Sequence, residues 1–197
     1  MLLDKFRDSV DVFNKSRVEN GLDGDIIFNL QLNLRKISCL YKEHDVGLKY
    51  PDVWGVLLQL MRKVAEWLEC DADVPCELED CCKTALVGCF HGLMWDKSKG
   101  RMDGLRSKVD AYIMACREIL VHSKSSNLPG EAFISLCDMS VVFGGGRDGH
   151  LFKFTETMVE DLIRYLEAYV FSNEDVEDTM EVTENMENQM EKLVIKR

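Results

Sequence analysis

The chain has 197 residues, of which 46% are hydrophobic, and a formal net charge of −11. This length allows one substantial hydrophobic core but leaves too little chain for two well-formed domains. The acidic balance argues against indiscriminate binding to polyanions, although a local basic face is compatible with it.

Apolar residues recur at intervals of three and four along almost the whole chain, which predicts amphipathic helices. The first three of these apolar stripes cover residues 3–13, 26–41 and 54–68. Pro51 and Pro75 suit the first turn of a helix, where proline is tolerated, so helices are expected to begin at about 51 and 75. The second of these helices continues to a break near Gly100.

Three further helices are expected in the second half of the chain. A long helix covers residues 102–120 and is ended by Pro129-Gly130. A shorter helix follows, marked by the apolar residues Phe133, Ile134, Cys137 and Val141. The last helix covers residues 158–169. Because no segment alternates as a strand does, the sequence predicts an all-α bundle of about seven helices.

The chain is expected to divide into one helical domain, residues 1–172, and a tail, residues 173–197. The tail carries eight acids against three bases and no aromatic residue, a composition typical of disordered segments. No apolar run reaches the roughly 18 residues that cross a bilayer, and the charged start does not fit a signal peptide. We therefore expect a soluble, intracellular protein that binds no membrane.

The glycine-rich segment after residue 143 fits the G-x-G-x-x-G spacing of a dinucleotide-binding loop. Its glycines are Gly144, Gly145, Gly146 and Gly149. Such a loop binds a pyrophosphate inside a βαβ unit, but one helix and no second strand follow it here. His150 and Leu151 stand where a phosphate loop needs Lys followed by Ser or Thr. The simpler interpretation is a flexible loop between two helices, and an enzyme that binds a phosphorylated ligand there is an alternative.

Eight cysteines fall mostly on apolar helix positions, which is typical of reduced, buried cysteines. A zinc site would draw on Cys70, Cys76, Cys81, Cys82, Cys89 and His91. None of these cysteines forms a C-x-x-C pair, and Cys82 and Cys89 have the i, i+7 spacing of a helical stripe. We expect no metal, no cofactor and no catalytic residue.

The densest positive charge lies between residues 97 and 108. Its five cations are Lys97, Lys99, Arg101, Arg106 and Lys108. Arg106 lies four residues before Asp110, so part of the cluster is able to form surface ion pairs. The cluster is either a solvated face or a strip that contacts phosphate groups. It would become a basic concavity if the fold brought four more cations to the same side, namely Arg35, Lys36, Lys42 and Lys49.

Several segments from residue 73 onward follow one another in a characteristic order. They are Asp73-Val74-Pro75-Cys76-Glu77-Leu78, the cation-rich helix Gly100 to Leu120, Ser140-Val141-Val142, Leu151-Phe152-Lys153-Phe154 and Thr155-Glu156-Thr157-Met158. A variable loop separates the third segment from the fourth, and the last opens an amphipathic helix. In this order and spacing the chain resembles the closterovirus RNA-silencing suppressors.

The resemblance implies an all-helical protein that forms a ring-like homo-oligomer in the host cytoplasm. Such a protein binds duplex small RNA without sequence preference and sequesters it from host silencing proteins, and it is not an enzyme. Recognition of A-form RNA through phosphates and 2′-hydroxyls is compatible with a small helical protein that lacks an aromatic platform. The cations carried over by position are Arg101, Arg106, Lys108, Arg117 and Lys153.

Two hypotheses about function follow. The first is a viral suppressor of RNA silencing that holds duplex RNA on a basic face, enlarged by oligomerisation. The predicted RNA-binding residues are Lys97, Lys99, Arg101, Arg106, Lys108, Arg117 and Lys153. The alternative is a helical protein–protein interaction module that binds no RNA, which accounts more directly for the net charge.

Overall fold

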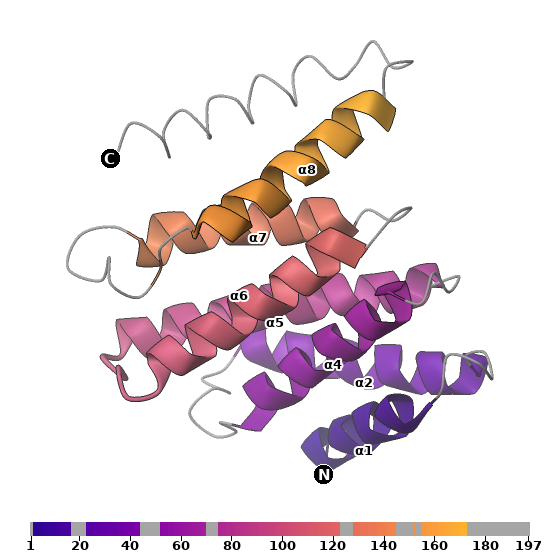
Figure 1. The fold of residues 1–197 in the computed structure, drawn as a ribbon. Helices are drawn as coiled ribbons and strands as arrows, with labels where there is room; N and C mark the ends of the chain where they lie inside the picture. The colour runs from indigo at the N-terminus through magenta and orange to yellow at the C-terminus, as the bar shows by residue number, and fades with distance from the viewer. Residues whose placement is uncertain are drawn as a thin grey trace. The chain divides into compact units, whose positions relative to one another are not determined.

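The computed structural model describes residues 2–16, 23–43, 52–69, 75–122, 128–144, 152 and 155–172. This part of the chain contains seven α-helices and no strand (Figure 1). The helices are α1 (Leu2–Lys15), α2 (Gly24–Glu43), α4 (Asp52–Glu69), α5 (Cys76–Ser98), α6 (Leu105–His122), α7 (Leu128–Phe143) and α8 (Glu156–Ser172). The prediction of an all-α chain with about seven helices is confirmed. Within the described ranges, no helix combines the length and apolar character needed to span a membrane.

The helices fall into two compact units by their contacts, Met1–Phe154 and Thr155–Arg197. In the second unit the structure describes α8. Thr155 caps the start of this helix, because its Oγ1 accepts a hydrogen bond from the Met158 amide at 3.3 Å. The predicted boundary at residue 172 borders on undescribed residues, and the predicted acidic tail lies outside the described part of the chain. Both therefore stay predictions.

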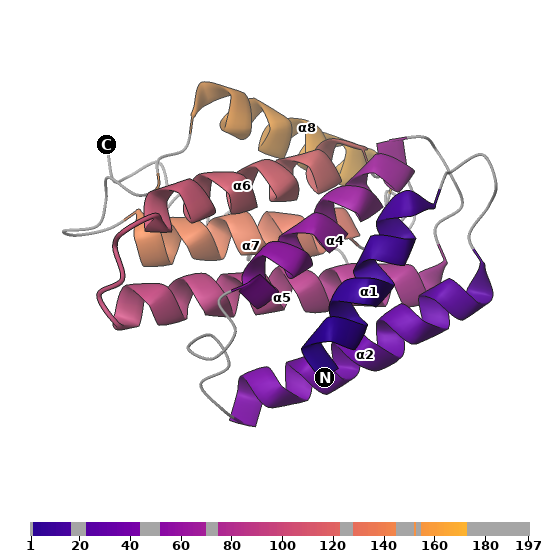
Figure 2. The same cartoon turned by 90° about the horizontal axis from the view of Figure 1, so that it is seen from below.

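The first unit is built from three helical hairpins. Consecutive helices contact each other in the pairs α1–α2, α4–α5 and α6–α7. The first helices of the pairs, α1, α4 and α6, contact one another in chain order, and so do the second helices α2, α5 and α7 (Figures 1 and 2). This is the two-layer stack of helical-repeat proteins, in which each hairpin buries its apolar face against its neighbours.

Tight packing between α4 and α5 depends on two glycines. A Cβ atom on Gly92 would lie 2.8 Å from Trp54 Cδ1, and one on Gly88 would lie 2.9 Å from Leu57 Cδ1. The missing side chains thus let the two helices approach closely. Because the earlier residue of α4 meets the later glycine of α5, the two helices run antiparallel.

Tyr112 joins the two layers at the centre of the stack. Its side chain on α6 is fully buried, and its hydroxyl donates to the backbone oxygen of Leu86 on α5 at 3.1 Å. Burial raises the pKa of this phenol well above its ordinary value. The hydroxyl therefore stays protonated and satisfies its hydrogen bond inside the core, as buried tyrosines usually do.

Two prolines mark helix starts. Pro75 directly precedes α5, so this helix begins where it was predicted to begin. The backbone oxygen of Pro75 accepts from the amides of Leu78 and Glu79 at 2.9 and 3.1 Å. Pro129 is the second residue of α7, whereas α6 ends at His122. The prediction that Pro129 ends the preceding helix is wrong, because proline lacks only an N–H group that the first turn of a helix does not use.

The exposed side of α7 carries apolar residues, as its buried side does. Phe133 and Cys137 are buried, but Ile134 is 56% exposed and Val141 is 74% exposed. Apolar residues lie almost all around this helix, so their spacing alone did not select the buried side.

Residues 141–143 form the last turn of α7, so a helix precedes the glycine-rich segment. A dinucleotide-binding loop needs a strand at this point. Of the four glycines, the structure describes Gly144, and the other three lie outside the described residues. The helical context supports the interpretation as a connection between helices.

Candidate functional site at the α5–α6 turn

The predicted basic cluster lies where α5 ends and the chain turns into α6. Gly100 adopts a φ of +67°, a conformation that glycine accepts without strain. Its amide donates to the Lys97 oxygen at 3.0 Å, and the Arg101 amide donates to the Asp96 oxygen at 2.9 Å. These two bonds form a Schellman motif, which explains the break predicted near Gly100. The motif brings Arg101 back beside the last turn of α5.

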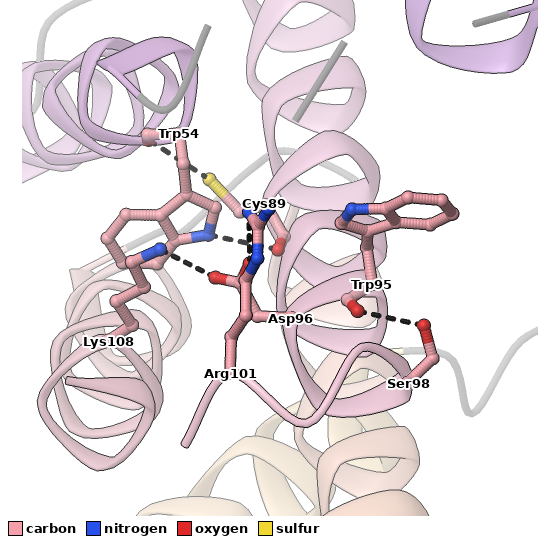
Figure 3. A network of polar contacts seen from close by, with 7 residues as sticks. All are labelled: Trp54, Cys89, Trp95, Asp96, Ser98, Arg101 and Lys108. Carbon is pink, nitrogen blue, oxygen red and sulfur yellow. Dashed lines mark hydrogen bonds and ion pairs between the residues drawn. The ribbon is translucent and has the colours of Figure 1, made fainter. Parts of the chain in front are cut away.

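Asp96 is the centre of this site (Figure 3). Lys108 Nζ lies 2.6 Å from Asp96 Oδ2, and Arg101 Nη1 lies 3.9 Å from Asp96 Oδ1. The carboxylate is only 14% exposed, while the side chains of Lys108 and Arg101 are 35% and 43% exposed. A partly buried carboxylate that accepts a short charge-assisted hydrogen bond is a strong local anchor. Two of the predicted RNA-binding cations are therefore held by an acid of the same molecule.

Trp54 extends the network from α4. Its Nε1 donates to the backbone oxygen of Cys89 at 3.0 Å, and the Cys89 thiol donates to the Trp54 oxygen at 3.8 Å. Lys108 Nζ lies 5.6 Å from the centre of the Trp54 ring, within the range of a cation–π contact. Residues from α4, α5 and α6 thus meet in one cluster (Figure 3).

The remaining members of the predicted site make other contacts or lie elsewhere on the chain. Lys97 Nζ donates to the backbone oxygen of Val142 and lies 5.1 Å from the Phe143 ring centre, which links the ends of α5 and α7. Lys99 Nζ lies 4.3 Å from the ring centre of Trp95. Two more cations sit on α6, the exposed Arg106 and the half-buried Arg117, and Lys153 lies outside the described residues.

Of the four cations that could have turned this cluster into a basic concavity, Arg35 and Lys36 lie away from it. Arg35 lies beside residues Asp80 to Thr84 of α5, about 20 Å along that helix from Lys97 at 1.5 Å per residue. Lys36 is exposed on α2 next to Arg35, while the side chains of Lys42 and Lys49 lie outside the described part. Arg35 and the basic cluster at the α5–α6 turn therefore lie towards opposite ends of α5.

The cysteines behave as core residues. Cys82, Cys89 and Cys116 are buried between helices, and burial raises the pKa of each thiol above its ordinary value. Zinc ligands are thiolates, so these environments oppose metal binding. Of the proposed zinc ligands, Cys76 and His91 are exposed on α5 and Cys70 lies outside the described residues.

Asp96 and Trp54 were missed by sequence reasoning. Asp96 lies directly before Lys97, and no periodic pattern marks it as the acid that pairs with Lys108. Trp54 begins the apolar stripe of residues 54–68 and is buried, at 8% exposure, but its contact with Lys108 requires α4 and α6 to be neighbours. The one signal in the sequence for this ion pair was that an acid, Asp96, directly precedes the basic cluster.

No protein-family model matches the chain. The chain is 26% identical over 193 residues to cohesin subunit SA-1 of Xenopus laevis, with 90% of the chain covered. It is 25% identical over 187 residues to cohesin subunit SA-3 of Homo sapiens, with 87% of the chain covered. The chain spans 14% of the length of each of these two relatives.

Proposed function

We propose that this chain is a helical protein-binding module that takes part in a cohesin-like assembly. The observation that carries the proposal is its distant similarity, along most of its length, to two proteins that are by name cohesin subunits. Stacked helical hairpins present extended surfaces and commonly serve as binding platforms. The net charge of −11 and the internal pairing of Lys108 and Arg101 also favour a protein partner over a polyanion.

The chemistry of the core supports a binding role without catalysis. The buried thiols of Cys82, Cys89 and Cys116 have raised pKa values, so they stay protonated and are poor nucleophiles. Tyr112 is likewise held in its protonated form. We propose that the module acts by its surface alone.

The purified chain is expected to co-elute in size-exclusion chromatography with a cohesin complex from the same organism that lacks its SA subunit. Subunits of a stable complex bury large surfaces against one another, so co-elution should persist at physiological ionic strength. Adding the intact SA subunit in excess should displace the chain if the two occupy the same place. Separate elution at both low and physiological salt would contradict the proposal.

As a second candidate we propose duplex RNA binding of the kind implied by the closterovirus resemblance. The observation that favours it is the exposure of Lys99, Arg101 and Arg106 around the α5–α6 turn. A ring of several subunits would combine weak phosphate contacts into stronger binding. The suppressor would then act on small RNA in the host cytoplasm.

Arg106→Glu is expected to weaken binding to a labelled short RNA duplex and to lower the salt slope by about one, because one phosphate contact is lost. Arg106 is the suitable position, since changing Arg101 or Lys108 would also break the contacts with Asp96. Arg62→Glu on α4, also exposed, makes the same charge change away from the turn. The titration includes a single strand and a DNA duplex. An absence of duplex binding at low salt, or equal effects of both variants, would reject this assignment.

A further inference from the structure

A groove of about 250 Å³ lies between α2 and α5, at the opposite end of α5 from the basic turn. The lining residues that matter here are Gln31, Leu34 and Arg35 of α2 and Asp80, Cys81 and Lys83 of α5. Both helices belong to the second layer of the stack. The groove therefore lies where two consecutive hairpins of the stack meet.

The floor of the groove is apolar and its walls are charged. Leu34 and Cys81 are both buried, whereas Arg35 and Asp80 are exposed and Lys83 is half-buried. Burial raises the pKa of the Cys81 thiol to about 12, so the thiol is a neutral part of the floor. The groove thus combines an apolar base with two cations and one carboxylate.

The two cations of the groove keep their hydrogen-bonding capacity. Within the described residues, neither Arg35 nor Lys83 has an ion pair or side-chain hydrogen bond. Thr84 uses its hydroxyl internally, donating to the Asp80 backbone oxygen at 2.8 Å. By contrast, Lys108 and Arg101 at the other end of α5 are held by Asp96. In a protein with a charge of −11, this is a local site of unused positive charge.

We infer that this groove binds an acidic peptide segment of a partner protein. Arg35 and Lys83 hold a carboxylate of the segment, since guanidinium and ammonium groups form strong charge-assisted hydrogen bonds with carboxylates. The apolar floor receives a neighbouring aliphatic side chain, and Asp80 accepts a hydrogen bond from the peptide backbone. The inference rests on the proposed function as a protein-binding module and names the chemistry of one partner segment.

The charges of the groove favour a peptide over a nucleic acid. Asp80 leaves the groove with one net positive charge, which matches a single carboxylate but is too little to neutralise the closely spaced phosphates of a polyanion. The apolar floor of Leu34 and Cys81 has a counterpart in an aliphatic side chain but none in a phosphate backbone. Charge complementarity therefore favours an acidic peptide as the occupant of the groove.

The test is a fluorescence anisotropy titration of the full chain against a labelled short peptide of alternating Leu and Glu. A peptide of alternating Leu and Gln has the same shape without the charge. We expect the Leu-Glu peptide to bind and the Leu-Gln peptide to bind at least about tenfold more weakly, as loss of a charged pair of roughly 1.4 kcal/mol predicts. Equal binding of the two peptides would overturn the inference.

The matched variants are neighbours on α2. Arg35→Glu reverses a charge in the groove, and Lys36→Glu makes the same charge change at the adjacent exposed residue, which does not line the groove. Arg35→Glu should weaken binding of the Leu-Glu peptide about tenfold relative to the wild type. Lys36→Glu should leave the affinity within about twofold of the wild-type value. Equal losses of peptide affinity in the two variants would mean that long-range charge alone drives binding. That result would overturn the assignment of the peptide site to the groove.

The two proposals fail in different ways. Co-elution with cohesin together with an absence of Leu-Glu peptide binding would overturn the groove while leaving the protein-binding function in place. Peptide binding that depends on Arg35 without co-elution would support the groove and count against the cohesin-like assembly. Displacement of the peptide by duplex RNA from the wild-type chain, but not from Arg35→Glu, would assign the groove to nucleic acid and overturn the inference.

Discussion

Replacement of Trp54 by alanine is expected to lower the free energy of unfolding by about 4 kcal/mol, the range of buried aromatic truncations. The side chain is buried between α4 and α5, donates to the Cys89 oxygen, and lies beneath Lys108. Removal of the indole leaves a cavity where α4, α5 and α6 meet, and Lys108 loses its cation–π contact. Urea unfolding followed by far-UV circular dichroism measures the change.

Trp54→Phe separates the packing of the ring from its hydrogen bond. Phenylalanine keeps much of the aromatic volume but has no N–H group for the Cys89 oxygen, so a smaller loss of about 1–2 kcal/mol is expected. Trp95→Ala is a second comparison, because Trp95 is only half-buried. Equal losses for alanine at both tryptophans would contradict the central role assigned to Trp54.

Gly92→Val is expected to destabilise the fold by about 2–3 kcal/mol, as overpacking of a tight core does. The first side-chain atom would lie 2.8 Å from Cδ1 of the Trp54 ring, which is large, rigid and buried. The helices would have to separate, and the bond to Cys89 would weaken. Thermal unfolding by calorimetry gives the change in Tm.

Gly88→Ala is a milder change at the same contact between helices. Its Cβ would lie 2.9 Å from Leu57 Cδ1, the far end of a flexible side chain that is able to move aside. Alanine is also favoured over glycine inside a helix by about 1 kcal/mol, so the net effect should be within about 1 kcal/mol of zero. A loss as large as that of Gly92→Val would show that backbone approach alone, not the Trp54 ring, limits residue size.

A double variant tests the contact directly. In Trp54→Ala with Gly92→Val, the valine would enter space vacated by the ring, so the combined loss should be smaller than the sum of the two single losses. Additive losses within about 0.5 kcal/mol would indicate that the two residues do not limit each other.

Local chemistry accounts for the parts of the fold that were predictable. Helix starts near 51 and 75 followed from the tolerance of proline in a first turn, and the break at Gly100 followed from the freedom of glycine at positive φ. Each signal acts within a few residues of itself. Pro129 shows the limit of such signals, because a proline marks a boundary without saying which of two helices it belongs to.

The buried face of α7 was not predictable from periodicity. Ile134 and Val141 have the same apolar character as their buried neighbours Phe133 and Cys137, and nothing local distinguishes the two sides. Which side of α7 becomes buried depends on where α5 and α6 lie. A helix with an apolar residue on nearly every side receives its orientation from its neighbours.

The sequence by itself determined that the chain is helical and where its positive charges are concentrated, because helix periodicity and charge density are properties of short stretches. Only the tertiary structure decided what those charges contact. Lys108 and Arg101 are held by Asp96 at the α5–α6 turn, while Arg35 and Lys83 meet in a groove without an acid paired to them. The physical reason is that ion pairs and grooves depend on distances between helices, which no spacing along one helix specifies.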